Sequence, residues 1–459
     1  MNGTHAARGV DLGTGSVGKL LCRLALPAIV AQVINVLYNM VDRMYIGHIE
    51  GVGADALTGV GVTMPLILAI SAFAALVSMG GAPRASIMLG RGDKEGAEQT
   101  LGNCTTMLLC VAAVLTAVVL LWGERILLLF GASENTVGYA WDYMRIYALG
   151  TVFVQLALGL NAFINAQGYA TMGMLTVLIG AVLNIVLDPV FIFALGMGVR
   201  GAALATVLSQ AVSSIWVVRF LTSERSFLRI RRACLRLRAQ VVLPCVALGV
   251  SPFIMQFTES VLSVCFNTSL LKYGGDMAVG AMTILSSAMQ FCMLPLQGLT
   301  QGAQPIVSFN YGARKMERVN RAFVLLLAAC LAFSTLLWAV AMFAPQVYAS
   351  IFTDDPALIA YSCDVMRVYM AASLLFGAQL ACQQTFIALG NAKISVFLAL
   401  LRKVILLIPL IFLLPPFFQD KVFAVFLAEP VADTIAVTVT VTMFFITFTR
   451  LKRAARAGA

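Results

Sequence analysis

Long apolar stretches alternate with short polar segments along the whole 459-residue sequence. Each stretch holds about 20 residues or more, the length that a helix needs to cross the hydrocarbon core of a bilayer. The pattern therefore predicts an all-α polytopic membrane protein with twelve transmembrane helices. The expected spans cover residues 17–42, 55–80, 97–122, 139–166, 172–194, 201–221, 240–270, 277–306, 318–343, 361–388, 396–416 and 421–447.

The basic residues are distributed unevenly between the segments that connect these spans. Most of the 31 lysines and arginines fall at the two ends of the chain, around the central segment, and after spans two, eight and ten. The group after span ten consists of Lys393, Arg402 and Lys403. Cytoplasmic loops carry an excess of lysine and arginine. We therefore expect a multi-pass protein of the cytoplasmic membrane with both termini on the cytoplasmic side.

The two halves of the sequence resemble each other. The segment DYMRIY at 142–147 returns as DVMRVY at 364–369, a shift of 222 positions, and Gly168 returns as Gly390 at the same shift. Six spans per half is an even number, so the repeat is parallel, with its axis along the membrane normal. We expect two six-helix lobes related by pseudo-two-fold symmetry. The predicted organisation is a cytoplasmic tail at 1–16, an N-lobe at 17–221, a basic cytoplasmic linker at 222–239, a C-lobe at 240–449 and a cytoplasmic tail at 450–459.

Span five carries an acid near its middle. Asn184 and Asp188 are four positions apart, so they share one face of a helix, and Pro189 follows directly. Inserting a carboxylate at that depth costs about 2.5–3.5 kcal/mol or more, and such a residue is a functional-site hypothesis by default. Because no basic residue lies in the same span, the partner of Asp188 must come from another helix.

Span one carries a polar face. Its members follow at spacings of three, four and three: Gln32, Asn35, Asn39 and Asp42. Tyr38 lies one turn from Asp42, and Pro27 removes a backbone hydrogen bond earlier in the span and is expected to bend it. The alternative for Asp42, beside Arg43, is a helix-end carboxylate at the outer surface. The polar face beneath Asp42 favours a role inside the protein.

Further polar faces in both halves predict a water-filled cavity, because lipid would not tolerate them. The expected cavity residues are Gln32, Asn35, Gln155, Asn161, Met255, Gln256, Glu259 and Gln290, and span six adds Thr206 on the same face as Gln210. Glu259 is the other acid that we expect deep in the membrane. Asp433 is a further candidate, and Glu429 is expected nearer the outer surface. We expect no deep arginine or lysine in this cavity.

Composition narrows the classes of function. The sequence is 60% hydrophobic and 11% charged, against about 45–50% and 25% in soluble domains. It has no hydrophilic block for an ATP-binding domain, so energy must come from an ion gradient or from the gradient of the substrate. The cysteines are scattered singly, and His5 and His48 are the two histidines, so we expect no metal site and no cofactor beyond a coupling H⁺ or Na⁺. The basic linker suits anionic lipid head groups better than nucleic acid.

Several of these segments resemble the multidrug and toxic compound extrusion (MATE) family, and more narrowly its DinF/MepA-like branch. The segments that carry the resemblance are LALPAIVAQ at 24–32, LYNMVDRMYIGHI at 37–49, NIVLDPVFIF at 184–193, GVRGAALATVLSQ at 198–210 and GLTQGAQPIVSFNYGARK at 298–315. The resemblance implies two six-helix bundles around a cavity and cation-driven drug export by alternating access. It also implies a proton or sodium site in the first lobe, formed by Asp42, Asn184, Asp188 and Thr206 with Asn39 or Tyr38 nearby. Pro27 matches the proline at which span one of the family bends.

Another branch of the family uses a second-lobe site that pairs a glutamate of span seven with an aspartate of span ten. Glu259 matches the glutamate, but residues 369–389 contain no acid. We therefore assign Glu259 to the attraction of cationic substrates rather than to ion coupling.

The resulting expectation is a monomeric antiporter that is not an enzyme and exports amphipathic organic cations in exchange for H⁺ or Na⁺. A lipid-linked oligosaccharide flippase of the same wider superfamily is the nearer alternative, and it would need a cationic cavity for pyrophosphate. A membrane enzyme or assembly scaffold is the more distant alternative. An enzyme would need a nucleophile–base pair or metal ligands, which the sequence does not offer.

Overall fold

The computed structural model describes residues 11–130, 132–351 and 355–457, except for the side chains of residues 54, 276 and 455–457. Most of the predicted N-terminal tail, including His5, lies outside these ranges. Ten helices in the described part of the chain are long and apolar enough to cross a membrane, and two bent helix pairs raise the number to twelve. All regular structure in these ranges is helical, and the predicted fold class is therefore confirmed.

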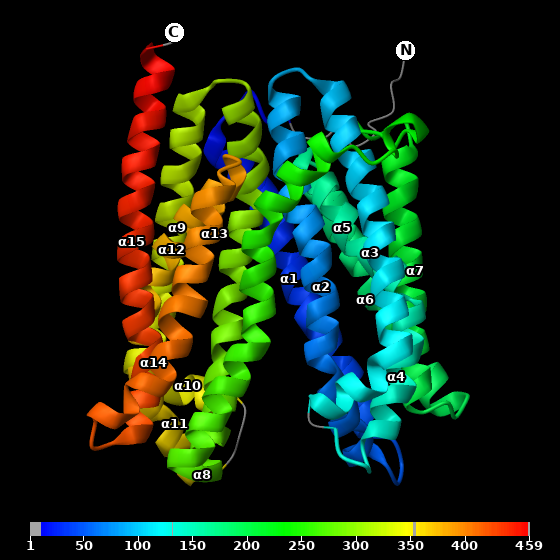
Figure 1. The fold of residues 1–459 in the computed structure, drawn as a ribbon, viewed down its shortest axis with the longest axis vertical. Coiled ribbons are helices and arrows are strands. Elements are labelled where there is room, and N and C mark those ends of the chain that lie inside the picture. Colours follow the sequence, from blue (N-terminus) through cyan, green and yellow to red (C-terminus); the bar gives the residue numbers. More distant parts are fainter. Residues whose placement is uncertain (1–10, 131, 352–354, 458–459) are drawn as a thin grey trace.

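The first half of the chain forms one group of helices, on the right of Figure 1. Its elements are α1 (Val17–Gly47), α2 (Gly53–Gly90), α3 (Lys94–Leu129), α4 (Val137–Leu149), α5 (Thr151–Ala166), α6 (Ala170–Pro189), the π-helical turn η1 (Val190–Ala194) and α7 (Val199–Thr222). The linker that follows contains the 3₁₀ turn η2 (Arg232–Cys234). It is docked on this lobe, since Gln167 accepts from the N–H of Leu228 at 2.8 Å and Asn103 accepts from that of Arg238 at 2.7 Å.

The second half forms the other group, on the left of Figure 1. Its elements are α8 (Ala239–Gly312), α9 (Met316–Phe343), α10 (Pro345–Ala349), α11 (Pro356–Tyr369), η3 (Ser373–Leu375), α12 (Phe376–Ala388), α13 (Ala392–Leu400), η4 (Leu401–Leu407), α14 (Ile408–Leu413), η5 (Pro415–Phe417) and α15 (Lys421–Ala457). The long α8 contains two spans, because Gly275 has a φ of 62° and breaks it.

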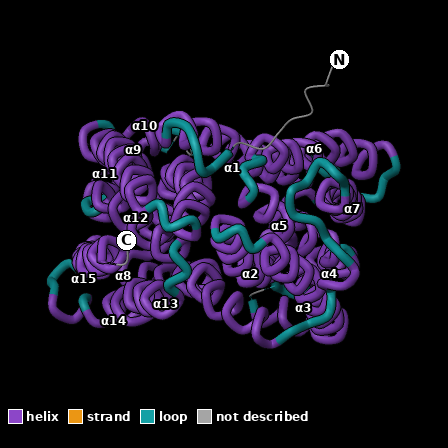
Figure 2. Tube along the Cα trace, turned by 90° about the horizontal axis from the view of Figure 1, so that it is seen from above, coloured by secondary structure: helices purple, strands orange, loops and turns teal. Residues whose placement is uncertain are grey.

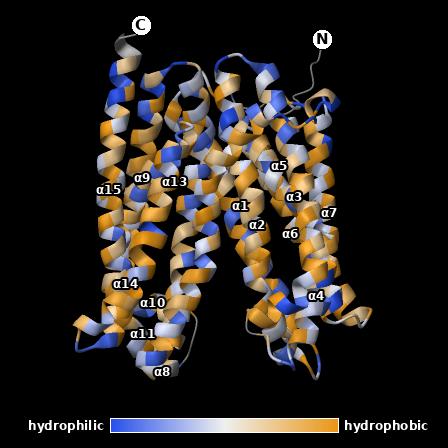
Figure 3. Cartoon of the chain, viewed as in Figure 1, coloured by the Kyte–Doolittle hydropathy of each residue, from blue (hydrophilic) through white to orange (hydrophobic). Residues whose placement is uncertain are grey.

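The two groups are separate lobes when the molecule is viewed from above, in Figure 2. The repeat in the sequence is visible in their geometry. The helices α4 and α5 meet at an angle of 59°, and the corresponding helices of the second lobe, α11 and α12, meet at 51°. Hydrophobic residues predominate along the helices in Figure 3, and large apolar side chains are exposed, with Leu121, Leu129 and Phe343 between 69% and 85% exposed. Such a surface is suited to contact with lipid.

Helix α1 belongs to both lobes. Five side chains of its first turns lie in a buried cluster with residues of α8, α9, α12 and α15: Val17, Leu20, Leu21, Leu24 and Ala25. Its second half contacts α6 in the first lobe. The helix runs continuously through Pro27, and beyond it Ile29 still packs closely on Gly298 of α8.

The segment before α1 is also held by the second lobe. Arg318 donates to the carbonyl oxygens of Leu12, Thr14 and Gly15 at 3.3, 3.0 and 2.7 Å, and Lys315 donates to that of Gly13 at 2.8 Å. Within the segment, hydrogen bonds from the Thr14 hydroxyl and the Gly13 N–H hold the pKa of Asp11 below its usual value. The segment that leads into α1 is thus held by the second lobe, whereas the far end of α1 lies in the first lobe.

The lobes touch near the end of the molecule that carries the linker, here called the linker end. The contact depends on glycines of α2 and α8, because a Cβ at Gly249 would collide with the carbonyl oxygen of Leu76 and one at Gly80 with that of Cys245. The two backbones therefore approach more closely than any larger residue would allow, as in other helix contacts in membranes.

We expect Gly249→Ala to push α2 and α8 apart and to lower the stability of the protein by about 1–3 kcal/mol, the usual cost of overpacking. The matched control is Gly61→Ala on α2, where an added Cβ meets nothing within 4 Å. This control should be neutral or stabilising by up to about 1 kcal/mol, since alanine favours helix over glycine. Thermal unfolding of the purified variants measures the difference, and equal melting temperatures would contradict the close contact.

Candidate ion and substrate sites

Helices α1 and α6 bring two acids together inside the first lobe. Asp42 from α1 is 9% exposed and Asp188 from α6 is 0% exposed, and their carboxyl groups lie beside each other. Asn184, one turn before Asp188, donates to its Oδ1 at 3.1 Å and lies 3.3 Å from the Thr206 hydroxyl of α7. Asp42 is thus an interior residue rather than a surface carboxylate, while the neighbouring Arg43 is exposed.

The acceptor oxygens of this group are not all used. Asp42 Oδ1, Asn184 Oδ1 and Asp188 Oδ2 are buried without a hydrogen-bond partner in the described part of the chain. Neither aspartate forms a salt bridge with a described lysine or arginine. Buried charge is normally paired, because an isolated ion loses its hydration without compensation. Oxygen ligands of this kind fit a proton shared between the carboxylates or a small hard cation.

Tyrosines complete the wall around the two acids. Tyr38 on α1 lies beside Asn39 and near Asp42, and Asn39 donates to the carbonyl oxygen of Asn35 at 2.6 Å. Tyr143 on α4, 4% exposed, interacts with the hydroxyl of Thr206 and lies near Asp42. Tyr143 was missed as a site residue, although it lies in the repeated DYMRIY segment. The repeat gives no signal for this position, because its counterpart in the second half is Val365.

The residues expected to line the cavity fall into two groups. Gln256, Glu259 and Gln290 of α8 are exposed, and Gln32 and Asn35 of α1 and Met255 are partly exposed. Two others connect helices of the first lobe. Gln155, 0% exposed, donates to the carbonyl oxygen of Ile70 on α2 at 2.7 Å, and Asn161 donates to that of Gly173 on α6 at 3.2 Å.

The second lobe contains buried bases, and the expectation that no arginine or lysine lies deep was wrong. Arg402 and Lys403 are 8% and 6% exposed and lie in η4, in the middle of the span at Ala392–Phe417. Their assignment to a cytoplasmic segment was also wrong. A count of basic residues along the sequence assumes that each one is in contact with water. Arg402 and Lys403 are instead neutralised by acids of other helices.

The buried bases pair with three carboxylates. Arg402 Nε lies 2.6 Å from Asp433 Oδ1, and its Nη2 lies 3.6 Å from Glu429 Oε1. Lys403 Nζ lies 2.8 Å from Glu259 Oε1. Glu429 is 5% exposed, so it is buried inside the lobe rather than at an outer surface. We call these five side chains the second-lobe ion cluster.

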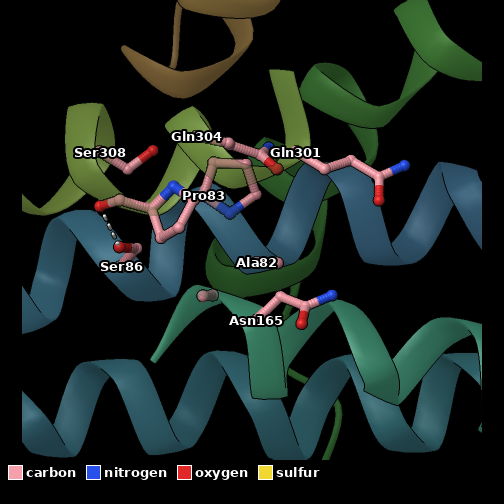
Figure 4. A pocket seen from close by; sticks show the side chains of 9 residues that line it. Ala82, Pro83, Ser86, Asn165, Gln301, Gln304 and Ser308 are labelled. Carbon is pink, nitrogen blue, oxygen red and sulfur yellow. Dashed lines mark hydrogen bonds between the residues drawn. The ribbon is translucent and has the colours of Figure 1, made fainter. Parts of the chain in front are cut away.

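A small polar pocket lies between the lobes toward the linker end, as Figure 4 shows. It is lined from the first lobe by Ser86 of α2 and Asn165 of α5, and from the second by Gln301, Gln304 and Ser308 of α8. Ser86 donates to the carbonyl oxygen of Pro305 at 3.4 Å, and Gln304 Nε2 is buried without a partner in the described structure. The cavity has a volume of about 10 Å³, the space of a single water. This pocket therefore has no room for an organic molecule.

Comparison with known proteins gives the family. The sequence model of the MatE family matches residues 27–190 and 252–413, once in each lobe. The chain belongs to the MatE family. The predicted resemblance is thereby confirmed, and the double match agrees with the two-lobe fold.

Similar MatE-related proteins support the same assignment. The multidrug export protein MepA of Staphylococcus haemolyticus is 24% identical over 423 residues, which cover 92% of each chain. MepA of Staphylococcus aureus is 23% identical over 404 residues, which cover 88% of each chain. A solved structure described as the outward-facing conformation of a multidrug resistance MATE family transporter has a TM-score of 0.90 at 22% identity, with 97% of this chain and 99% of that one covered. This likeness establishes the fold.

We expect Arg402→Met to lower stability strongly, by about 3–5 kcal/mol, because Asp433 and Glu429 would lose their buried partner. The control is Arg367→Met. Arg367 lies 3.8 Å from Asp364, and the two side chains are 52% and 80% exposed, so its loss should cost less than about 1 kcal/mol. Thermal unfolding in detergent compares the two, and a similar loss in both variants would argue against a buried network.

Proposed function

We propose that this MatE-family protein is a secondary active multidrug exporter in the cytoplasmic membrane. It exchanges amphipathic organic cations for H⁺ or Na⁺ by alternating access, with both termini on the cytoplasmic side. The multidrug export named for the two MepA relatives supports the substrate class. The observation that carries the coupling is the buried pair Asp42 and Asp188, which keeps oxygens without a hydrogen-bond partner and forms no salt bridge with a described lysine or arginine.

The coupling ion acts on the charge of this pair. Two neighbouring carboxylates repel each other, and burial strengthens the repulsion because the interior screens charge less than water does. A proton or Na⁺ between Asp42 and Asp188 removes the repulsion and lets α1 and α6 pack closely. Loss of the ion restores the repulsion and favours a different position of the second half of α1.

Helix α1 transmits this change to the other lobe. Its first turns are packed among residues of the second lobe, and the segment before it is held by Arg318. A movement of the Asp42 end must therefore be absorbed at Pro27 or passed to the contact between the lobes. Proline removes one backbone hydrogen bond, so a change of helix direction costs less there than elsewhere in α1.

The substrate cavity is the space between the lobes on the side away from the linker end. Its exposed polar residues, Gln256, Glu259 and Gln290, include one acid, and exposed phenylalanines such as Phe257 supply apolar contact. A cavity that combines amides, aromatic rings and a carboxylate suits amphipathic cations. Alternating access requires the glycine contacts of the linker end to separate while the opposite side closes.

We expect Asp42→Asn and Asp188→Asn each to abolish gradient-driven efflux of a cationic dye from proteoliposomes, because the amide cannot exchange a proton and lacks the charge to hold Na⁺. The matched control is Asp142→Asn in the same lobe, a partly exposed acid that pairs with Arg145 and Arg200 at 3.0 and 2.9 Å. Efflux by this control should stay close to that of the unmodified protein.

The same vesicles identify the coupling ion when a pH gradient and a sodium gradient are imposed separately. Efflux that follows only one gradient assigns that ion. Full gradient-driven efflux by either Asp42→Asn or Asp188→Asn would refute the assigned coupling role.

A further inference from the structure

The second-lobe ion cluster does not balance its own charge. It contains three carboxylates, Glu259, Glu429 and Asp433, and two bases, Arg402 and Lys403. With all five groups in their ordinary ionised forms, the cluster carries one negative charge in excess. Burial makes an excess charge of this kind costly. One proton or one monovalent cation beside the carboxylates would balance it.

Only one member of the cluster is open to a ligand. The side chain of Glu259 is 58% exposed, whereas those of Lys403, Arg402, Glu429 and Asp433 are 7%, 10%, 6% and 2% exposed. Phe253, six positions before Glu259 on α8, contacts Phe73 of the first lobe with 5.0 Å between the ring centroids, so this part of α8 borders the space between the lobes. A cation from that space can reach Glu259 directly, but not the acids behind it.

The inner side of the same carboxylate is already occupied. Lys403 Nζ lies 2.8 Å from Glu259 Oε1, and its ammonium is the strongest favourable charge on that acid. Lysine carries its charge on a flexible four-carbon stem, so it can change partners without movement of the backbone. Glu429 is within electrostatic reach of Lys403, and its own contact with Arg402 is long, at 3.6 Å. Glu429 is therefore an alternative partner for the displaced ammonium.

We propose that Lys403 is a tethered counter-cation that competes with the organic cation for Glu259. In the empty transporter Lys403 neutralises Glu259, and a bound substrate cation takes over Glu259 while Lys403 turns toward Glu429. Competition from Lys403 weakens the binding of the substrate cation and so favours its release. Because the cluster has one negative charge in excess, it accommodates one additional positive charge. This inference rests on the proposed export of organic cations and assigns Lys403 as a residue that determines specificity.

The test measures binding of tetraphenylphosphonium to the full-length protein in nanodiscs at fixed pH, with uncharged triphenylphosphine oxide as the matched ligand. Lys403→Met keeps the length of the side chain and removes the competing charge. We expect it to tighten tetraphenylphosphonium binding about tenfold or more, because hydrogen bonds to charged groups contribute about 1.5–3 kcal/mol. Binding of the uncharged ligand should not change.

Two further single variants, Lys403→Arg and Glu259→Gln, keep the test decisive if Lys403→Met folds poorly, and a double variant is added where it folds. Lys403→Arg retains the positive charge and should not tighten binding of the cation. Glu259→Gln should weaken it about tenfold, and the double variant Glu259→Gln/Lys403→Met should bind like Glu259→Gln, because Lys403 acts only through Glu259. Thermal unfolding of each variant verifies that it is folded.

The inference is overturned if folded Lys403→Met binds the cation no more tightly than the unmodified protein, or if Glu259→Gln leaves binding unchanged. Equal tightening for the uncharged ligand would also overturn it, because that result indicates a change of shape rather than of charge. Gradient-driven efflux of tetraphenylphosphonium by the unmodified protein is measured separately. Its absence refutes the proposed export, whereas the binding comparison still decides the role of Lys403.

Discussion

The packing of Asp42 on α1 against Asp188 on α6 is the interaction on which the rest of the structure depends. Two buried acids without a basic partner are unfavourable in any protein. Here they destabilise the contact between α1, which contacts both lobes, and α6 of the first lobe. In the proposed exchange, the position of α1 depends on whether a positive ion is bound between these acids. The hydrogen bonds from Asn184 and the nearby Thr206 orient Asp188, so the ion acts on a fixed carboxylate.

The same helix explains why a local charge has an effect at a distance. The beginning of α1 is packed among α8, α9, α12 and α15, and Arg318 holds the segment that leads into it. The lobes otherwise meet mainly through close backbone contact at glycines of α2 and α8. Such contact can separate and reform with little side-chain rearrangement, whereas the packed beginning of α1 cannot. Movement is thus concentrated near Pro27.

The sequence was sufficient to predict the spans, the lobes and Asp188, since each leaves a local signal: an apolar run, a repeat, or an acid in the middle of a span. The proximity of Asp42 and Asp188 was an inference from two separate polar faces. Arg402 and Lys403 were misplaced because their neutralising partners lie some 30 or 140 residues away, and a charge count along the sequence does not register pairing. The place of Tyr143 beside Asp42 and the hydrogen bonds from Arg318 to the segment before α1 were missed for the same reason. Both depend on contacts between distant parts of the chain.

The buried bases also bear on the flippase alternative, which required a cationic cavity. Arg402 and Lys403 are present at the required depth, but both are paired with acids that outnumber them, and the first lobe adds Asp42 and Asp188 without a base. The second-lobe ion cluster and the pair of Asp42 and Asp188 therefore each carry net negative charge when ionised, which disfavours a pyrophosphate at either place. Because the two negative sites lie in different lobes, the proposed coupling ion and the proposed organic cation need not exclude each other by direct contact. Each can instead act on the binding of the other through the arrangement of the lobes. Helix α1 connects the first site to the contact between the lobes, and α8 connects the second site to it.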